Sequence, residues 1–325
     1  MTMTGKIALE EHFSIDATAN DMESFFPGYP LSPEFAQKML GIKPDRIEQM
    51  DKYGIDMIII SLNSPAVQRI LKKEDAINLA KTANDTLAEE CAKHPARFAG
   101  FAALPMQDPD AAAEELHRCI RDYGFKGALV NGYSQLNDTE TSIYYDLPEY
   151  WDFWGEVEKL DVPMYLHPRS PLFSQLKPYE GHPWLMAAAW AFSVETGTHA
   201  LRLMCSGLFD RYPGLQIILG HLGELLPGNI WRTSHRIALR PVGCPAKRPI
   251  SEYLSNNFYI TTSGHFRLAP LQLAMTEMGS DRIMFATDYP FEEMSEAAEW
   301  FDAMEIGESE RLKIGRLNAM KLFRL

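Results

Sequence analysis

Eight short runs of strand-forming residues recur along this chain of 325 residues, and they constrain its fold more than any other feature. They occupy residues 6–10, 56–61, 98–103, 127–130, 163–166, 216–219, 259–262 and 282–286. Helix-like segments lie between them, and such alternation predicts repeated βα units with a parallel sheet. Eight units of this kind are the number that closes a barrel. We therefore predict an α/β fold of the (β/α)8 TIM-barrel type.

The composition of the runs agrees with parallel strands. IIIS at 58–61 and IIL at 217–219 are almost wholly apolar, which is typical of strands covered on both faces. An open sheet of eight strands would give the same pattern. No Gly-x-Gly-x-x-Gly motif follows the first run and no P-loop motif occurs, so nucleotide-binding folds lose their usual support. One barrel of roughly 250 residues with insertions accounts for the length, and we expect a single domain over residues 1–325.

The segments between the runs divide into helices and long loops. Residues 110–123 follow a Pro-Asp start that resembles a helix cap. Residues 75–93 carry one apolar stripe with helical spacing, at Ile77, Ala80, Ala83, Leu87 and Cys91. Residues 14–44 and 167–187 are long, irregular and rich in proline. Because both follow strand ends, we predict that they are lids or binding loops at the carboxyl-terminal face of the barrel.

The charge balance and the cysteines narrow the class of protein. A formal net charge of −13 argues against nucleic-acid binding, which needs a basic surface to neutralise phosphates. The four cysteines, at 91, 119, 205 and 244, lack Cys-x-x-Cys spacing and are too few for a disulfide framework. The first residues show no sustained apolar run, and no stretch approaches the ~20 apolar residues of a membrane span. We expect a soluble, cytoplasmic protein with no signal peptide and no membrane partner.

Residues suited to metal binding fall at the carboxyl ends of the predicted strands. Glu10 and His12 close the first run, His167 closes the fifth, and Asp288 follows the eighth. A barrel brings these ends to one mouth. Residues i and i+2 of an extended strand share a face, so Glu10 and His12 can point together into the barrel while Glu11 points away. We predict that two imidazoles and two carboxylates converge there.

This ligand set contains nitrogen and oxygen but no thiolate. It suits one divalent metal ion, Zn2+ or Mn2+, and leaves positions open for water or substrate oxygens. The sequence does not choose between the two metals, and we expect no organic cofactor. Any one of these residues alone would more often be a hydrogen-bonded strand-end histidine or a helix cap. Their joint occurrence at strand ends favours the metal site.

Two further groups of polar residues are candidates for catalysis and binding. His221 closes the sixth run, and Glu224 three residues later can orient its imidazole or raise its basicity. We expect His221 to be a general acid/base or a hydrogen-bond donor to the substrate, with a fifth metal ligand or a helix cap as alternatives. Arg232 and Arg169 are candidates to bind a phenolate or carboxylate. A loop salt bridge is the simpler role for Arg169.

Aromatic residues of the long loops could form the walls of a ligand pocket. Phe25, Phe26 and Trp184 lie in these loops, where they could line a pocket, form the core of a lid or contact another subunit. Asn131, which closes the fourth run, is a further candidate because of its place at a strand end.

Several motifs resemble a known family. They are ALEEHF (8–13), YLHPR (165–169), GHLGE (220–224), WR (231–232), TTSG (261–264) and ATDYPFE (286–292). Together they resemble the amidohydrolase-2 group of metal-dependent decarboxylases. The resemblance runs nearly end to end, including FAALPMQDP (101–109), GALVNG (127–132) and IGRLNAMKLF (314–323). The triplet EEH favours the branch that acts on 2,6-dihydroxybenzoate, since members acting on 2,3-dihydroxybenzoate or salicylate tend to have EEA.

The resemblance implies a role for each matching residue. It implies metal ligands at Glu10, His12, His167 and Asp288, catalytic roles for Asp288, His221 and Glu224, and substrate contacts at Phe25, Asn131 and Arg232. The implied reaction is the reversible, non-oxidative decarboxylation of an ortho-hydroxybenzoate, with 2,6-dihydroxybenzoate giving resorcinol and CO2. The partners are then a small aromatic acid and further copies of the chain in a homodimer or homotetramer. The loop at 20–33 departs from the group's pattern, so another ortho-hydroxybenzoate remains an alternative substrate.

Two rival functions fit the same residues. In a hydrolase on this barrel, the metal activates water and Asp288 acts as general base on a lactone or amide. Alternatively, the barrel keeps its metal as a structural element or binds an aromatic ligand without turnover. The nearly full-length resemblance and the aromatic loops favour the decarboxylase. An acid/base histidine beside a complete ligand set argues against a protein without activity.

Overall fold

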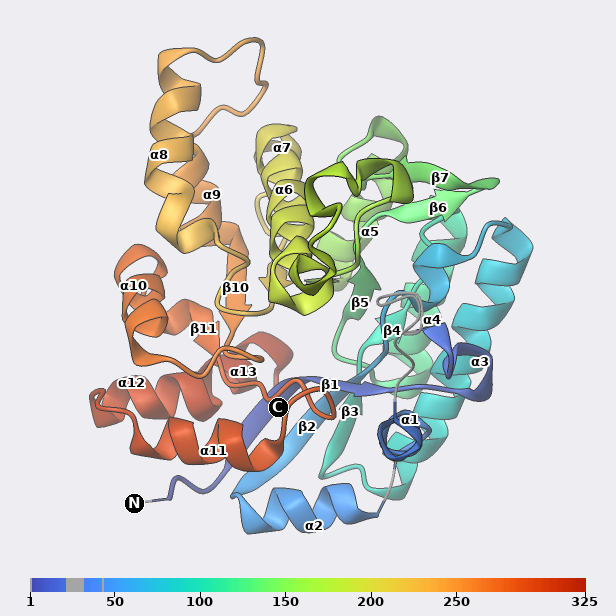
Figure 1. The fold of residues 1–325 in the computed structure, drawn as a ribbon, viewed down its shortest axis with the longest axis vertical. Helices are drawn as coiled ribbons and strands as arrows, with labels where there is room; N and C mark the ends of the chain where they lie inside the picture. Colours follow the sequence, from blue (N-terminus) through green and yellow to red (C-terminus); the bar gives the residue numbers. More distant parts are fainter. Residues whose placement is uncertain (1, 22–31, 43) are drawn as a thin grey trace.

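The computed structural model describes residues 2–21, 32–42 and 44–325, and its central strands are parallel. These strands are β1 (Lys6–Phe13), β2 (Ile55–Leu62), β3 (Phe98–Gly100), β4 (Ala102–Ala103), β5 (Ala128–Asn131), β8 (Met164–His167), β9 (Ile217–Leu219), β10 (Phe258–Thr261) and β11 (Ile283–Met284). They pair in the orders β1-β2-β3 and β11-β10-β9-β8-β5-β4. Figure 1 shows these strands at the centre of the molecule.

Two contacts join the paired strands into a ring. Strands β3 and β4 are halves of one strand interrupted at Phe101, whose amide donates to the carbonyl of Ile60 at 2.9 Å. At the other seam the amide of Leu9 donates to the carbonyl of Phe285 at 3.2 Å, and Leu9 forms a parallel bridge with Ala286. Within the described residues, each of the eight predicted runs is therefore a strand of one barrel. The predicted TIM barrel is confirmed.

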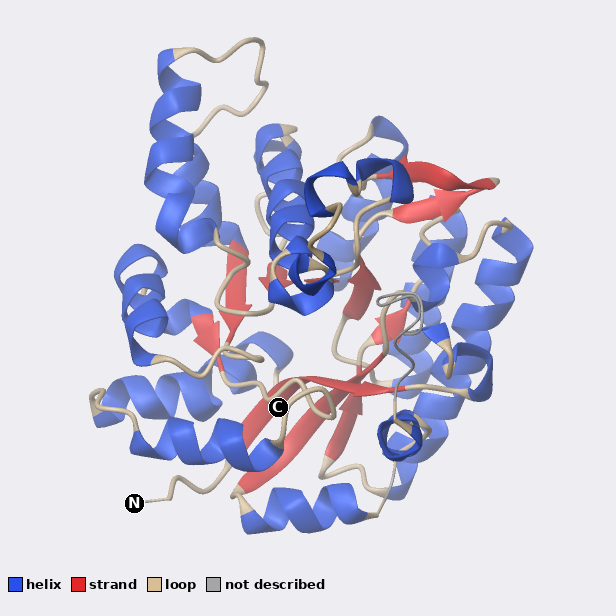
Figure 2. Cartoon of the chain, viewed as in Figure 1, coloured by secondary structure: helices blue, strands red, loops and turns tan. Residues whose placement is uncertain are grey.

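Helices surround this barrel, as Figure 2 shows. They are α1 (Pro33–Met39), α2 (Asp45–Lys52), α3 (Lys73–Lys93), α4 (Pro109–Tyr123), α5 (Trp151–Leu160), α6 (Ala191–Cys205), α7 (Leu208–Arg211), α8 (Leu226–Leu239), α9 (Ile250–Asn257), α10 (Leu268–Met278), α11 (Met294–Ala303), α12 (Glu308–Leu312) and α13 (Asn318–Phe323). In the part of the chain that the structure describes, none of the helices has both the length and the apolar character that crossing a membrane requires.

Both predicted helices are present, and the signals at their ends explain their limits. The predicted helix at 75–93 is α3, which begins two residues earlier, at Lys73. The predicted helix at 110–123 is α4, where the side chain of Asp108 accepts a hydrogen bond from the Ala111 amide at 3.2 Å. Gly124 ends α4 with a φ of 67°, a left-handed conformation that glycine adopts without steric cost.

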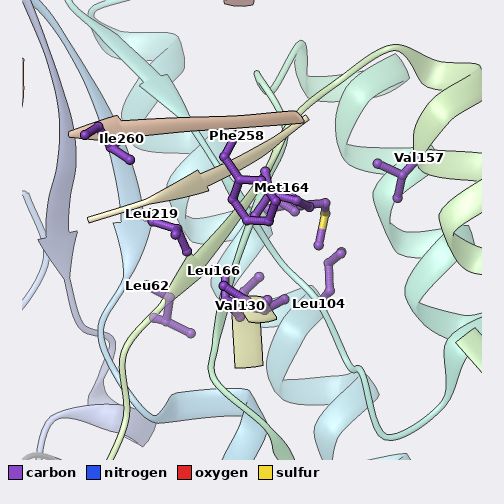
Figure 3. Close-up of a cluster of buried hydrophobic side chains, with 14 of the residues drawn as sticks. Leu62, Leu104, Val130, Val157, Met164, Leu166, Leu219, Phe258 and Ile260 are labelled. Carbon is purple, nitrogen blue, oxygen red and sulfur yellow. The ribbon is translucent and has the colours of Figure 1, made fainter. Parts of the chain in front are cut away.

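The core has two layers, because successive side chains of a strand point to opposite faces. Val130, Leu166, Leu219 and Ile260 face outward and belong to the same cluster as Val157 of helix α5 (Figure 3). Their neighbours along the chain face inward. Each of the eight strands of the ring contributes at least one side chain to this inner layer. Its members from the strands are Ile7, Leu9, Ile59, Ala99, Phe101, Leu129, Tyr165, Ile218, Tyr259, Met284 and Ala286.

Strand β1 breaks this alternation at Glu10. Ala8 pairs with Ile58 and Glu11 with Ile60, so three steps along β1 match two along β2, which is a β-bulge. Glu10 has a φ of 60°, a left-handed conformation that costs a residue other than glycine about 1–2 kcal/mol. The extra residue changes which of the following side chains point into the barrel. Leu9 and Glu10 both face the barrel interior as a result.

Two irregular features interrupt the alternation of strands and helices, and the second is the long irregular segment predicted at 167–187. A hairpin of β6 (Ser134–Leu136) and β7 (Asp138–Ile143) follows β5, and its second strand, DTETSI, has no apolar alternation that would identify it. The long segment after β8 contains short 3-10 turns at Phe173–Gln175, Lys177–Tyr179, Pro183–Leu185 and Ala187–Ala189. Both features follow the carboxyl ends of barrel strands, which is the face where barrels of this type carry their long loops.

The inner layer includes Phe323 of α13, which predicts a large contribution to stability. Its ring centroid lies 5.7 Å from that of Phe101. Phe323→Ala should lower the free energy of unfolding by about 3–5 kcal/mol, because it removes a buried aromatic ring and leaves a cavity. Phe173, which is 81% exposed, is the matched control, and its replacement by Ala should change stability by less than about 0.5 kcal/mol. Urea denaturation measures the free energy of unfolding of both variants. Equal losses in the two variants would contradict the burial of Phe323 in the inner layer.

Candidate metal centre and active site

The side chains at the barrel mouth follow the inner layer by two residues. His167 follows Tyr165 in this way, and Asp288 follows Ala286. Because residues i and i+2 of a strand share a face, strand β8 directs His167 inward. Asp288 lies beyond the end of β11 in a left-handed conformation, with a φ of 71°, and reaches the same mouth from there. On β1 the bulge adds Glu10 and His12. The side chains predicted as metal ligands therefore reach one mouth from three strands.

Glu10, His12, His167 and Asp288 form one buried group. Each offers a ligand atom, and these four atoms all lie within 4.8 Å of one another. His12 Nε2 lies 3.2 Å from Asp288 Oδ1, and His167 Nε2 lies 3.4 Å from Glu10 Oε1. The convergence of these residues at the mouth agrees with the arrangement that the sequence predicts.

The donor atoms of this group fit a divalent cation. Glu10 Oε1, His12 Nε2 and Asp288 Oδ1 are buried, and none has a hydrogen-bond partner among the described residues. Buried polar atoms without partners cost free energy, and a cation would remove that cost. The other ring nitrogen of His12, Nδ1, lies 3.3 Å from Ser61 Oγ, which leaves Nε2 for a metal.

Glu10 differs at its two carboxylate oxygens. Oε2 accepts hydrogen bonds from the hydroxyls of Tyr165 and Ser263, and the hydroxyl of Thr261 lies 3.2 Å away. Gly220 provides the space, because a Cβ at this position would lie 2.8 Å from both oxygens of Glu10. Oε1 is thus the atom that faces the other three ligands.

His221 and Glu224 form a pair at the edge of this group. His221 Nδ1 hydrogen bonds to Glu224 Oε1 at 2.6 Å, and the Glu224 side chain is fully buried. This bond directs His221 Nε2 toward the mouth, 3.5 Å from Asp288 Oδ2 and 3.6 Å from Glu10 Oε1. The buried carboxylate orients the imidazole, as the spacing in the sequence predicts.

The charges of this site alter the pKa of its groups. Burial raises the pKa of Glu10, and burial next to His12 lowers the pKa of His167 well below its ordinary value. For His221, burial alone would lower the pKa, but the charges of Glu224 and Glu10 raise it well above the ordinary value. For Asp288, burial alone would raise the pKa, but the imidazoles of His12 and His221 lower it to about 2. These shifts favour the charged forms of both His221 and Asp288.

Backbone strain is concentrated in the same residues. Glu10, His221, Glu224 and Asp288 have φ values of 60°, 51°, 52° and 71°. A left-handed conformation costs such residues about 1–3 kcal/mol each, and it persists where the surrounding structure holds it in place. The barrel thus keeps these four side chains in an orientation that a relaxed chain would not favour.

The structure places the residues predicted to bind substrate in different surroundings. Asn131 lies opposite His167 in the strand ladder; its Nδ2 donates to the Asn63 carbonyl at 3.2 Å, and its buried Oδ1 has no partner among the described residues. Arg232 is exposed on α8 and forms no ion pair within the described part of the chain. Phe25 and Phe26 lie outside the described residues. Asn131 therefore has the mouth position that its strand end predicts.

Of the loop candidates, Trp184 is exposed and Arg169 is buried. Trp184 is 64% exposed. Within the described residues, Arg169 hydrogen bonds to carbonyl and amide oxygens in place of the loop salt bridge expected as its simpler role. Its guanidinium lies 4.0 Å from the centre of the Tyr133 ring and donates to the carbonyls of Gln68 and Tyr133. Arg169 thus serves to tie the loop after β8 to the barrel.

A cavity of about 460 Å³ lies beside the metal group. His221 and Gly264 form one end of it, and the Gly264 backbone approaches Asp288 closely enough that a Cβ would lie 3.4 Å from Oδ2. Apolar side chains form most of the remaining wall, including Trp190, Phe192, Leu222, Leu225 and Leu273. An apolar cavity with polar groups at one end suits a small aromatic ligand.

Several residues of the site are not identified as site residues by the sequence analysis. The hydroxyl groups around Glu10 belong to Tyr165, Thr261 and Ser263, which lie in the motifs YLHPR and TTSG, but only the alternation of β8 and β10 shows that they face the mouth. Phe291 packs its ring 5.5 Å from that of His12. It lies within the ATDYPFE motif, three residues after Asp288, and that position could have identified it.

Comparisons with known proteins show the family of this chain. The family profile described as Amidohydrolase matches residues 27–325, and the chain therefore belongs to the amidohydrolase family. Gamma-resorcylate decarboxylase of Rhodococcus jostii (strain RHA1) is 56% identical over 328 residues, which cover 99% of each chain. The predicted family resemblance is confirmed.

Two solved structures have nearly the same fold. A crystal structure of 2,6-dihydroxybenzoate decarboxylase complexed with 2,6-dihydroxybenzoate has a TM-score of 0.96 at 56% identity, covering 99% of this chain and 100% of that one. A dihydroxybenzoic acid decarboxylase from Polaromonas sp. JS666, with bound manganese and the inhibitor 2-nitroresorcinol, has a TM-score of 0.96 at 53% identity, covering 99% and 98%. The described part of the chain thus has the same barrel as these two decarboxylases.

The four converging side chains predict one tightly bound metal ion. His167→Ala should weaken Mn2+ binding by at least about 100-fold, because even the loss of an outer partner of a metal ligand costs 10–100-fold. His182→Ala is the control, since His182 is exposed in the loop after β8. Equilibrium dialysis with elemental analysis measures the binding. Equal Mn2+ binding by both variants would show that His167 is not a metal ligand.

Proposed function

We propose that this chain catalyses the non-oxidative decarboxylation of 2,6-dihydroxybenzoate to resorcinol and CO2. The observation that carries the proposal is the buried group of Glu10, His12, His167 and Asp288 beside the His221–Glu224 pair. The likeness to decarboxylases of the same length, 56% identical over 99% of the chain, supports it.

The chemistry of decarboxylation determines which groups the site must supply. Loss of CO2 directly from a benzoate would leave an aryl carbanion, which is too basic to form in water. The ring carbon that bears the carboxylate must therefore be protonated first. An ortho oxygen held as phenolate donates electron density to that carbon, and a group beside the ring must deliver the proton.

A divalent cation, Mn2+ or Zn2+, held by Glu10, His12, His167 and Asp288 would act as Lewis acid and template for the carboxylate and the ortho oxygen. Asp288 delivers the proton to the ring carbon. Asp288 must carry a proton when it reaches the ring carbon, and His221, whose Nε2 lies 3.5 Å from Oδ2, is the group placed to supply that proton. Glu224 stabilises the charged imidazole. When the C–C bond breaks, its electron pair restores the aromatic ring and CO2 leaves.

The remaining residues bind the substrate. The apolar cavity beside His221 and Gly264 accepts the ring, and Asn131 Oδ1, buried without a partner among the described residues, is a hydrogen-bond acceptor for a phenol. Phe25 is proposed to cover the ring from the loop at 20–33. Arg232 is proposed to neutralise the acid. Arg232 is exposed on α8 and forms no ion pair among the described residues, so we propose that it acts across a contact with a second copy of the chain.

A homodimer or homotetramer is proposed on the same ground. Helix α8 and the loop that follows it form one extremity of the molecule in Figure 1. Trp231, Leu239 and Val242 in this region are 68%, 61% and 84% exposed. Apolar side chains that gather on a surface favour burial against another chain. Light scattering of the purified protein measures the mass of the assembly.

Two broader proposals concern the chain as a whole. We propose that residues 1–325 form one domain, since strands from both ends of the chain close the same barrel. We also propose that the protein resides in the cytoplasm. The free thiols of all four cysteines support this location. The net charge of −13 argues against nucleic acid as a partner.

The first test is CO2 release from a panel of ortho-hydroxybenzoates by protein loaded with Mn2+ or Zn2+. The expected result is release from 2,6-dihydroxybenzoate that stops when a chelator removes the metal and returns when the metal is restored. No release from any member of the panel would overturn the proposal and turn attention to lactones and amides.

The proton route predicts the effect of Asp288→Asn. The amide keeps an oxygen that can bind the metal but cannot carry the proton, so the metal should stay largely bound while kcat falls by at least about 100-fold, the contribution of one acid/base group. Rapid-quench CO2 measurement and metal analysis of the same sample give both quantities. Normal turnover by this variant would refute the role of Asp288.

Glu224→Gln separates the charge of Glu224 from its shape. The amide removes the charge that raises the pKa of His221, so kcat should fall by about 10²-fold. Because His221 then loses its proton at lower pH, the alkaline limb of the kcat profile should move to lower pH. The KM for substrate should change little, because Glu224 contacts His221 and not the cavity. A pH profile of kcat identical to that of the unaltered enzyme would exclude this role.

A further inference from the structure

We propose that the hydroxyls of Tyr165, Thr261 and Ser263 are positioning groups that let Glu10 offer only one oxygen to the cation. The place that a second Glu10 oxygen would take then stays open for the substrate's own second oxygen. The consequence for substrate choice rests on the proposed function, whereas the restraint on Glu10 rests on geometry alone.

The three hydroxyls form a connected network around Glu10 Oε2. The hydroxyls of Tyr165 and Ser263 both donate to this oxygen. Thr261 Oγ1 lies 3.2 Å from it, 2.8 Å from the Tyr165 hydroxyl and 2.9 Å from Ser263 Oγ. Tyr165, Thr261 and Ser263 are each fully buried, so bulk solvent does not reach these bonds.

The direction of one bond is fixed by the backbone. Ser263 Oγ accepts from the amide of His221 at 3.1 Å. Its own proton is therefore available to Glu10 Oε2. Since His221 begins the segment that carries the acid/base pair, Ser263 links the restraint on Glu10 to the placement of His221.

Strand order explains how a side chain from β1 reaches this network. Tyr165 lies on β8 and Thr261 on β10, with β9 between them. Gly220 directly follows β9, and a Cβ there would come within 2.8 Å of both Glu10 oxygens. The absence of a side chain at this one position lets the carboxylate of Glu10 lie between the hydroxyls of two flanking strands.

The network leaves the two oxygens of Glu10 with different capacities. A carboxylate oxygen has two lone pairs, and those of Oε2 are taken by the donated hydroxyl protons. Oε1 is buried, has no hydrogen-bond partner among the described residues and lies 3.4 Å from His167 Nε2. For Glu10 to bind a cation through both oxygens, it would have to give up these buried hydrogen bonds at a cost of about 1–3 kcal/mol each.

This restraint selects a class of substrate. Four residues that each give one atom leave a cation such as Mn2+ with positions for further oxygen ligands. An acid with a hydroxyl ortho to its carboxylate supplies two oxygens at the right spacing. A benzoate without that hydroxyl supplies only the carboxylate. The network therefore favours chelating ortho-hydroxy acids by keeping the second position free.

The test counts water molecules on bound Mn2+. Water-proton relaxation of Mn2+-loaded protein should report fewer water ligands in the double variant Y165F/S263A than in the unaltered protein, because Glu10 Oε2 becomes free to bind. The Kd of 2,6-dihydroxybenzoate should rise by about 10-fold, the low end of the effect of losing an outer partner of a ligand. The Kd of benzoate should not change.

Thr262→Val is the matched control. Thr262 is as buried as its neighbours, but its hydroxyl hydrogen bonds to the amide and carbonyl of Ala286 and does not contact Glu10. This variant should lose stability while the water count and both Kd values stay unchanged. If the double variant fails to fold, S263A alone gives the same measurements with a smaller expected change.

The outcomes separate this inference from the proposed function. An unchanged water count in the double variant, or equal loss of affinity for both acids, overturns the restraint even if the unaltered enzyme releases CO2. An altered water count in a protein that decarboxylates nothing keeps the restraint on Glu10 and overturns the decarboxylase.

Discussion

One extra residue in strand β1 determines how the site is assembled. In a regular strand the inner layer at Ile7 and Leu9 would continue to Glu11, and His12 would face the surrounding helices. The bulge at Glu10 reverses that pattern. Glu11 turns to the other side, where its carboxylate accepts hydrogen bonds from the amide and hydroxyl of Thr287, and the other barrel strands can stay regular.

The opposite side of the barrel supplies what the bulge requires. Regular alternation on β8 and β10 brings hydroxyls to Glu10, while β8 and the end of β11 bring His167 and Asp288. Left-handed backbone at Glu10, His221 and Asp288 costs free energy that the two apolar layers of the barrel offset. Stability is thus located in the strands and their helices, and strain is located at their carboxyl ends, where the chemistry takes place.

The sequence was informative where a local pattern decides the structure. Apolar runs predicted all eight barrel strands, and strand ends predicted the place of His167, Asp288 and Asn131. The hairpin β6–β7 could not be predicted, because the polar segment DTETSI is held by pairing and not by burial. The contact of these hydroxyls with Glu10 could not be predicted either, although the motifs YLHPR and TTSG contain them, since only the three-dimensional register brings them together. Arg232 shows the remaining limit, because its proposed role depends on a second chain.

A crystal structure of the Mn2+-loaded protein, with the ion located by anomalous scattering, tests the central claim most directly. The predicted result is one ion bound by Glu10 Oε1, His12 Nε2, His167 Nε2 and an oxygen of Asp288, with Glu10 Oε2 still hydrogen bonded to Tyr165 and Ser263. An ion elsewhere, or one bound by both oxygens of Glu10, would contradict the account of how the bulge and the hydroxyls build this site.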